Sequence, residues 1–160
     1  MSAANRHRYV MAGLLEGWDW FDNALQALLK SGGFEGYNKS QSMMIMYVSS
    51  GVRRPAEIAR KMRLSRQAIG HIAGQLLDMK VLEANPDADD GRSVVLGFSP
   101  KARSLQTAAQ KIITALEARL EQRIGARKMA ALIEILNLDW GSAIEDGDLA
   151  AVKRQRTGSR

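Results

Sequence analysis

Apolar residues recur every three or four positions near the start of the chain, which is the spacing of one face of an α-helix. The pattern continues for about 20 residues and stops at Ser31-Gly32-Gly33, where glycine and serine favour a helix end. We therefore expect a long amphipathic helix here. Its apolar positions are Val10, Leu14, Trp18, Phe21, Leu25 and Leu28.

The next two helices are predicted from their first residues. Asn38 is a favourable N-cap, and Gln41, three residues later, completes a capping box. Residues 43–48 are apolar nearly all round, so this helix is expected to be buried and to end near Gly51. Pro55 suits the first position of a third helix.

A fourth helix is expected over residues 65–79, with Ser65 as its cap. Its large apolar residues fall on one side when successive residues are rotated by roughly 100°. Gly70 and Gly74 fall on the outer side, although a glycine costs about 1 kcal/mol in a helix interior. The outer side therefore carries a bare patch. The inner side consists of Ile69, Ile72 and Leu76, flanked by Ala68 and Ala73.

Two strand candidates follow, residues 81–84 and 93–98. The stretch NPDADDG between them is dense in turn-forming residues, so a β-hairpin is predicted. Helical spacing returns from Pro100 to about Leu138, with a break after Gly125. Three helices followed by a hairpin is the order of a winged helix-turn-helix. The expected fold class is mainly α with a small β-hairpin wing (α+β).

The composition limits the chemistry of this chain of 160 residues. It has no cysteine, and its two histidines are far apart in sequence, so neither a disulfide nor a metal site is expected. No apolar run approaches the roughly 18 residues of a membrane span, and no signal-peptide pattern is present. We expect a cytoplasmic protein with no membrane partner and no cofactor.

The whole chain has a net charge of +6. Positive charge is concentrated in its middle part. Residues 53–103 carry ten basic and six acidic side chains, and residues 153–160 add four basic ones. Such a segment suits a polyanion such as nucleic acid. A solvated surface would explain the charge equally well.

The fourth helix and the hairpin supply candidates for contacts with DNA. Arg66 and Gln67 carry the guanidinium and amide groups that match base edges in the major groove. The bare patch would let the backbone approach DNA closely; alternatively it is merely tolerated, or it accommodates a neighbouring helix. Arg92, near the hairpin tip, suits the minor groove, unless it pairs with Asp87 or Asp89. The candidate DNA contacts are Arg54, Arg63, Ser65, Arg66, Gln67, Gly70, His71, Gln75 and Arg92.

Four short motifs fall in register along this region. They are Tyr37-Asn38-Lys39-Ser40-Gln41 at the start of the second helix, Glu57-Ile58-Ala59 before the turn, Leu64-Ser65 at the start of the fourth helix, and Asp90-Gly91-Arg92 with Phe98-Ser99 in the hairpin. Together they resemble the L-T-x-x-Q, E-L-A, hydrophobic-Ser and D-x-R…L-T motifs of the multiple antibiotic resistance regulator (MarR) family of winged helix-turn-helix transcription factors. The resemblance covers residues 37 to about 138, and the opening helix fits too.

Four positions depart from the family's pattern. Gly70 and His71 stand where a threonine and an arginine are common, Lys80 where a helix-ending glycine is expected, and Gly91 where the wing often has a second arginine. The family's usual base contacts therefore do not carry over directly to these positions.

The apolar stripes at both ends of the chain are more extensive than a small winged domain can cover. The resemblance implies a homodimer built from both termini, although the helices could instead fold back as a monomeric bundle. Residues 1–36 and 104–140 would then form a helical dimerisation region, residues 37–103 a DNA-binding winged helix-turn-helix domain, and residues 141–160 a flexible tail.

The resemblance also implies a small-molecule effector, because members of the family commonly bind small, often aromatic, molecules between the dimer helices and the winged domain. Methionine and aromatic side chains make an adaptable apolar pocket, but ordinary core packing explains each of them as well. The candidates are Trp18, Phe21, Met43, Met46 and Tyr47.

The leading hypothesis is a homodimeric DNA-binding transcriptional regulator, a repressor released by an effector. It would read a pseudo-palindromic site on double-stranded DNA through the recognition helix 65–79 and the wing 85–93. A winged-helix protein-interaction module without specific DNA binding is the alternative. An enzyme is the least supported class, since no catalytic constellation or phosphate-binding loop is found.

Overall fold

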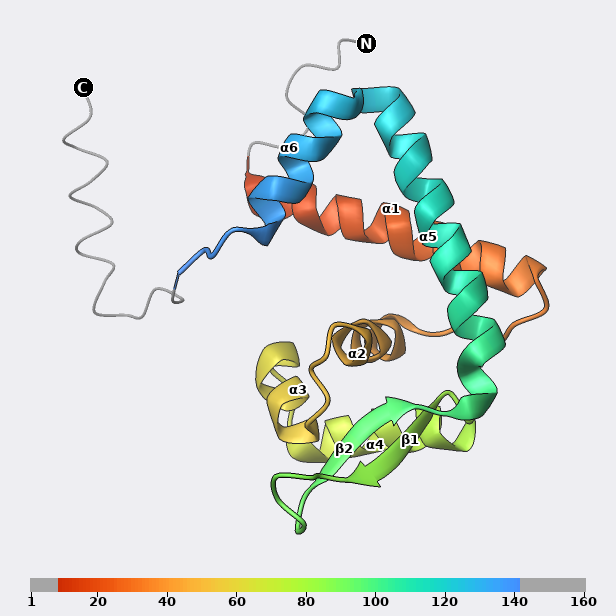
Figure 1. Ribbon diagram of the computed structural model, residues 1–160, viewed down its shortest axis with the longest axis vertical. Coiled ribbons are helices and arrows are strands. Elements are labelled where there is room, and N and C mark those ends of the chain that lie inside the picture. Colours follow the sequence, from red (N-terminus) through yellow and green to blue (C-terminus); the bar gives the residue numbers. More distant parts are fainter. Residues whose placement is uncertain (1–8, 142–160) are drawn as a thin grey trace, which may run out of the picture. The chain divides into compact units, whose positions relative to one another are not determined.

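The computed structural model describes residues 9–141 and confirms the mainly α fold with a small hairpin (Figure 1). The chain divides into two compact units, one up to Arg119 and one from Leu120 onward, which are described separately. The predicted tail, residues 141–160, lies outside the described residues except for Gly141. In chain order, the elements are α1 (Val10–Ser31), α2 (Lys39–Ser49), α3 (Pro55–Met62), α4 (Arg66–Asp78), β1 (Leu82–Pro86), β2 (Val94–Phe98), the 3₁₀ turn η1 (Pro100–Ala102), α5 (Arg103–Ile124) and α6 (Ala126–Asn137).

The helices begin where the capping residues predict. The backbone N–H of Gln41 donates to the Asn38 side chain, and the backbone N–H of Asn38 donates to Gln41 Oε1, each at 3.0 Å. The backbone N–H of Ala68 donates to Ser65 Oγ at 3.1 Å. Each cap satisfies N–H groups that the first helical turn leaves without a partner.

The hairpin pairs antiparallel from Leu82 opposite Phe98 to Pro86 opposite Val94. β1 runs two residues beyond its predicted end, and Pro86 is tolerated there because it occupies the last position of the strand. The backbone N–H of Leu96 also donates to the carbonyl of Arg53, which attaches the segment before α3 to β2. The hairpin is thus bonded to the helices as well as to itself.

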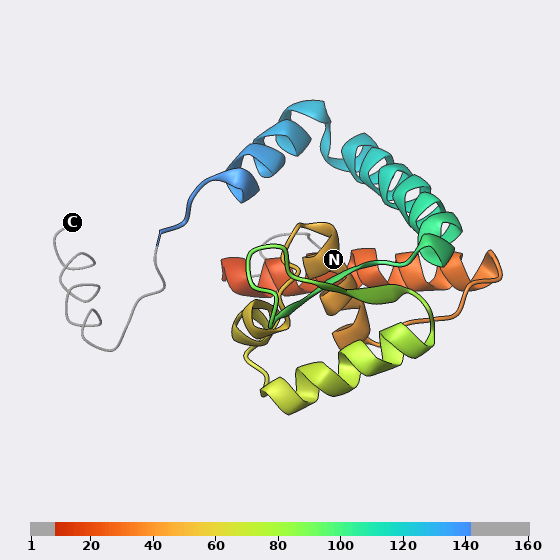
Figure 2. The same ribbon diagram turned by 60° about the horizontal axis from the view of Figure 1, so that its bottom comes forward.

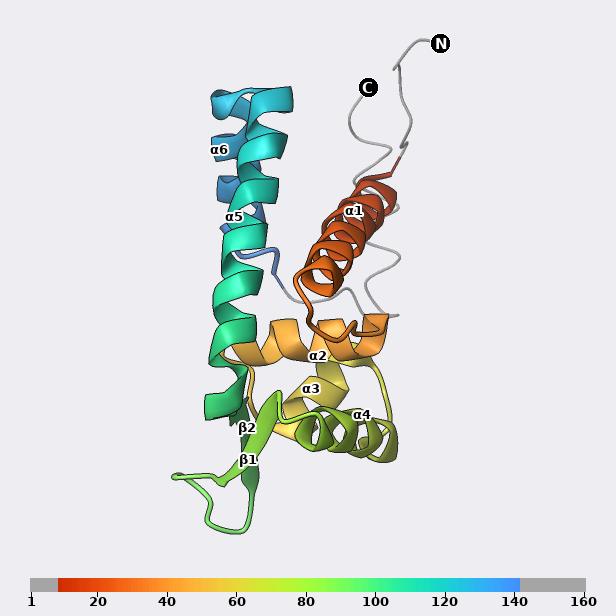
Figure 3. The same ribbon diagram turned by 90° about the vertical axis from the view of Figure 1, so that its right-hand side faces the viewer.

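One core holds α2, α3, α4 and the hairpin together, and Figure 3 shows these elements gathered around it. Leu29 at the end of α1 and Leu105 at the start of α5 also belong to this core. The core of the winged elements therefore extends to the end of α1 and the start of α5, and the expected division at residues 36 and 103 stays a prediction. The most deeply buried side chains are Met44, Ile58, Ile69, Leu76, Leu82 and Leu96.

The expectation that α2 is buried all round is wrong. Met44 and Val48 are buried, but Met46 is 38% exposed, because α2 packs against α3, α4 and β2 on one side only. Its buried side also holds two polar residues, Gln41 and Ser42. Both make side-chain hydrogen bonds to other helices, Gln41 to Gln75 of α4 and Ser42 to Gln26 of α1.

The second unit contains the end of α5 and α6, joined at Gly125 as predicted. Gly125 has a φ of 88°, a left-handed conformation that glycine adopts without strain. Met129 is buried, but most of the apolar residues of α6 are exposed in the chain. No helix among residues 9–141 has the length and apolarity needed to cross a membrane. The exposed apolar residues of α6 are Leu132, Ile133, Ile135 and Leu136.

Candidate nucleic-acid interface

Helix α4 lies at the edge of the first unit, with no other element over its outer side (Figures 2 and 3). The structure confirms the predicted division of this helix into two faces. Ile69, Ile72 and Leu76 are buried in the core, while Gln67 is exposed on the opposite side and Arg66 is exposed at its margin. The exposed side chains carry the hydrogen-bonding groups that suit base edges and phosphates.

The two glycines of α4 form a bare patch on this outer side. A Cβ atom added at Gly70 or at Gly74 would meet nothing within 4 Å. The interpretation that the glycines make room for a neighbouring helix is therefore wrong within the described chain. Their cost to the helix is not repaid by packing inside the protein.

His71 and Gln75 lie beside the patch, one turn apart on α4. Gln41 Nε2 donates to Gln75 Oε1 at 3.1 Å, and Gln75 Nε2 lies 3.0 Å from His71 Nε2. Gln75 is thus turned back toward α2, with both ends of its amide engaged inside the protein. Sequence reasoning missed Gln41 as a contributor to this site because its spacing from Asn38 already explained it as a cap.

Arg54 has partners within the chain. Its Nε donates to Asp87 Oδ2 at 2.6 Å, and its Nη2 donates to Asp87 Oδ1 at 3.1 Å and to Asp89 Oδ2 at 2.8 Å. These bonds, those to Asp87 foremost, raise the pKa of the Arg54 guanidinium further above its usual range. Arg54, at the N-cap of α3, therefore holds the base of the hairpin turn, and its predicted contact with DNA stays a prediction.

Arg92 keeps its charge available at the hairpin tip. The interpretation that it pairs with Asp87 or Asp89 is wrong, because those carboxylates face Arg54. Arg92 is exposed and has no ion pair with any described residue. Its backbone N–H donates to Asp90 Oδ1 at 3.1 Å, which fixes its place in the turn. The hydrogen bond from Ser93 Oγ, and to a smaller extent the one from the Arg92 backbone N–H, holds the pKa of Asp90 below its usual range.

The turn between α3 and α4 brings Arg63 beside Ser65. Arg63 has a φ of 53°, and Lys80, just after α4, has a φ of 57°. Both are left-handed conformations that favour glycine, which explains why a glycine is expected in the family where this chain has Lys80. Arg63 and Ser65 are exposed at the start of α4, where the helix dipole favours an anion.

The predicted effector residues lie on α1 and α2. Trp18 Nε1 is shielded from solvent and has no hydrogen-bond partner among the described residues. Phe21 packs edge-on against Trp20, with ring centroids 4.8 Å apart. Met43 and Tyr47 are half-buried, and Tyr47 packs against the core. Their role in effector binding stays a prediction.

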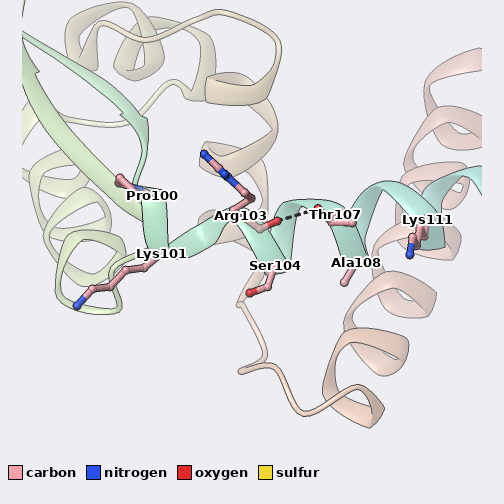
Figure 4. Close-up of a pocket in the computed structure, with 7 residues that line it drawn as sticks. All are labelled: Pro100, Lys101, Arg103, Ser104, Thr107, Ala108 and Lys111. Carbon is pink, nitrogen blue, oxygen red and sulfur yellow. Dashed lines mark hydrogen bonds between the residues drawn. The ribbon is translucent and has the colours of Figure 1, made fainter.

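Two shallow depressions on the surface of the first unit were not predicted. One lies between α3 and the start of α4, beside Arg66. The other follows η1 and the first turns of α5, where Lys101, Arg103 and Lys111 lie around it (Figure 4). The basic side chains there point in different directions and do not converge on one point. None of the predicted effector residues lines either depression.

No group of three or more metal-ligating side chains suited to a metal ion occurs within residues 9–141. The outer side of α4 and the wing expose the donors and cations of Arg66, Gln67 and Arg92, together with the carboxylates of Asp78, Asp89 and Asp90. The donors and cations can bind an anion by charge and by hydrogen bonds.

Comparisons with known proteins place this fold. No protein-family model and no curated protein matches the chain. Solved structures match it well: transcriptional regulator Tm0710 from Thermotoga maritima has 14% identity over 94% of this chain and 97% of that chain, with a TM-score of 0.54. The reduced form of MarR from E. coli has 16% identity over 82% and 96%, with a TM-score of 0.61. NadR in complex with 4-hydroxyphenylacetate has 16% identity over 85% and 95%, with a TM-score of 0.63.

These similarities confirm the resemblance to MarR-type regulators at the level of the fold. The matched proteins named here are transcriptional regulators or MarR and NadR themselves, and the chain spans nearly their whole length. The predicted winged helix-turn-helix fold is therefore correct.

The ion pair at the base of the wing predicts a pH dependence of stability. The hydrogen bond from Arg54 is the main cause that holds the pKa of Asp87 below its usual value, and the hydrogen bond from the backbone N–H of Asp89 is the second. A carboxylate with a lowered folded pKa stabilises the fold fully above its ordinary pKa of about 3.9, and this contribution is lost as the pH falls through the folded pKa. We expect Asp87→Asn to lower the free energy of unfolding at pH 7 and to have little effect near pH 2.

Urea unfolding of the wild type and of Asp87→Asn between pH 7 and pH 2 measures this difference. Glu117→Gln, on the exposed side of α5, is the matched control and should leave the pH profile unchanged. A difference between wild type and Asp87→Asn that stays constant down to the lowest pH would contradict the assignment.

Proposed function

We propose that this chain is a MarR-type transcriptional regulator that binds double-stranded DNA through the outer side of α4 and the wing. The observation that carries the proposal is the pairing of two features on one unit. Helix α4 leaves a bare, exposed side with Arg66 and Gln67 upon it, and the neighbouring hairpin carries Arg92 without an ion pair to any described residue.

Each group has a physical role in this proposal. Arg66 and Gln67 read base edges in the major groove, while the patch at Gly70 and Gly74 brings the backbone of α4 close to the duplex. Arg63 and Ser65 contact phosphates at the start of α4. Arg92 enters the minor groove, where the negative potential attracts an arginine. Arg54 acts indirectly, by holding the turn that carries Arg92.

The regulator is proposed to act as a homodimer. Tyr9, Val10 and Met11 at the start of α1 are at least 66% exposed, and the apolar residues of α6 are exposed as well. Exposed apolar patches of this kind are typical of interaction sites, and a second copy of the chain would cover them. Two recognition helices about 34–36 Å apart would then read a pseudo-palindromic site.

Repression released by an aromatic effector is the proposed mode of regulation. The support is Trp18 Nε1, a shielded donor without an acceptor among the described residues, on the helix that carries Phe21. The matched structure of NadR holds 4-hydroxyphenylacetate, an aromatic anion. An effector of that class could supply an acceptor to Trp18, and release would require it to prefer a dimer with displaced recognition helices.

The protein-interaction module, which rests on the exposed glycines of α4 and on the acidic residues of the hairpin, loses part of its support. The acidic residues of the hairpin, which would have offered a docking surface, are engaged within the chain. Asp87 and Asp89 bond to Arg54, and Asp90 accepts from Ser93 Oγ at 2.6 Å. We therefore favour the DNA-binding regulator, for which we propose a cytoplasmic location.

Binding to duplex DNA tests the proposal. A duplex is first selected from a randomised pool by the wild-type protein, and its affinity is then measured by fluorescence anisotropy over a salt series, with a scrambled duplex as competitor. We expect affinity that survives the competitor and falls steeply with salt. Arg66→Gln should weaken binding and relax the sequence preference, and Arg92→Gln should weaken binding, whereas Arg63→Gln, which removes a proposed phosphate contact, should reduce the slope of log affinity against log salt by about 1.

Arg119→Gln, an exposed arginine of α5, is the matched control and should leave affinity and slope unchanged. Failure to bind any duplex at low salt, or equal affinity for selected and scrambled DNA in all variants, would overturn the proposal.

The dimer is tested by sedimentation velocity. Leu136→Asp places a charge on the exposed apolar side of α6, so we expect it to shift the protein from dimer to monomer while its far-ultraviolet circular dichroism is kept. Glu134→Lys, on the opposite side of the same helix from Leu136 at roughly 100° per residue, is the control and should remain dimeric. A monomeric wild type, or dissociation by both variants alike, would contradict this interface.

A further inference from the structure

A chain of hydrogen bonds leads from the start of α2 to His71 on the outer side of α4. It begins at the backbone N–H of Asn38, which donates to Gln41 Oε1 at 3.0 Å. A backbone N–H can only donate, so the atom of the Gln41 amide that faces it must be the oxygen. The amide nitrogen of Gln41 therefore points the other way, toward Gln75, at 3.1 Å.

The same reasoning fixes the next two groups. Gln41 Nε2 can only donate, so the atom of Gln75 that faces it must be Oε1. Gln75 Nε2 is then the atom that lies 3.0 Å from His71 Nε2. An amide nitrogen has no lone pair to offer, so His71 Nε2 must be the acceptor. A neutral imidazole whose Nε2 accepts carries its proton on Nδ1.

We infer that Gln41 and Gln75 hold His71 in the Nδ1–H tautomer, so that its free polar atom on the outer side of α4 is a hydrogen-bond donor for an acceptor on DNA. The DNA part of this inference rests on the proposed function; the tautomer does not. Gln41 is 8% exposed and acts only through Gln75 and His71, so it is a positioning residue.

No single group in this series of hydrogen bonds can be turned around without placing two donors against one another. Rotating the Gln75 amide by half a turn would place its NH₂ against the NH₂ of Gln41, two donors facing one another. A proton on His71 Nε2 would likewise face the NH₂ of Gln75. Because the capping box fixes Gln41 at the start of α2, the tautomer of an exposed imidazole on α4 is set by a buried residue of another helix.

The fixed tautomer restricts what His71 can recognise. A donor suits guanine N7 and O6, adenine N7, thymine O4 or a phosphate oxygen, whereas it faces another donor at cytosine N4 or adenine N6. His71 stands where the family often has an arginine, and in this tautomer it offers one donor without a fixed charge.

The tautomer is read directly by a long-range ¹H–¹⁵N correlation spectrum of the free, ¹⁵N-labelled full chain at about pH 8, where an ordinary imidazole is neutral. The chain has two histidines, and His7→Gln assigns the remaining signals to His71. We expect the pattern of a protonated Nδ1 and an unprotonated Nε2. The Nε2–H pattern, which predominates for free imidazole side chains in water, would overturn the inference.

Two variants reverse the donor and acceptor roles in this series of hydrogen bonds while keeping a side chain of the same size at each position. Glu at position 75 can only accept, so Gln75→Glu should receive hydrogen bonds from Gln41 and from His71 and switch His71 to the Nε2–H tautomer. Gln41→Glu keeps the capping box, which accepts a glutamate at this position, and should force the same switch through Gln75. Gln106→Glu, an exposed residue of α5, is the control and should leave the tautomer unchanged. An unchanged tautomer in both folded variants would overturn the inference.

The donor is tested separately on selected DNA. His71→Asn keeps a nitrogen donor near the place of Nδ1, whereas His71→Leu removes it. Because a hydrogen bond contributes about 0.5–1.5 kcal/mol net, we expect roughly a two- to thirteenfold loss of affinity for His71→Leu and little loss for His71→Asn. Equal affinity of His71→Leu and wild type, or equal losses in both variants, would overturn the DNA part.

The spectrum of the free protein and the DNA-binding measurement test the tautomer and the proposed function separately. A wild-type protein that binds no duplex would overturn the proposed function and the DNA part together, while the spectrum of the free protein would still decide the tautomer.

Discussion

Helix α4 has to fill the core of a small winged unit with one side and present the other side to solvent, and it has 13 residues for both tasks. Ile69 and Leu76 are at most 1% exposed, so they leave the helix no freedom to rotate. Burial of this kind contributes about 1.5–3 kcal/mol for each large apolar side chain. The position of every group on the outer side follows from that packing.

Polar side chains then fix the surface elements that packing alone leaves loose. Gln41, buried in α2, orients Gln75 and His71 on α4. Arg54, before α3, ties down the turn that carries Arg92. Buried polar groups are costly unless they are hydrogen-bonded, and these bonds join segments that lie far apart along the chain. Hydrogen bonds to residues far away in the sequence therefore tie down the candidate DNA-binding surface both at α4 and at the wing.

Most of the fold could be predicted from the sequence because it is encoded locally. The capping box at Asn38 and the cap at Ser65 involve residues three positions apart, and the turn residues between the strands determine the hairpin. The partners of Arg54 and Gln41 could not be predicted, because they lie 33 to 35 residues away and depend on how the elements pack. The exposure of Met46 was missed for the same reason: helical periodicity does not tell how many sides of a helix are covered.

The central claim is that the bare side of α4 faces DNA, and the two glycines offer the most direct measurement of it. The double variant Gly70→Ala/Gly74→Ala has room for both methyl groups inside the protein. Each alanine should raise the free energy of unfolding by about 0.5–1 kcal/mol. If DNA approaches the patch closely, the same variant must bind the selected duplex more weakly than wild type does. A variant that gains stability and keeps its full affinity for DNA would contradict the account.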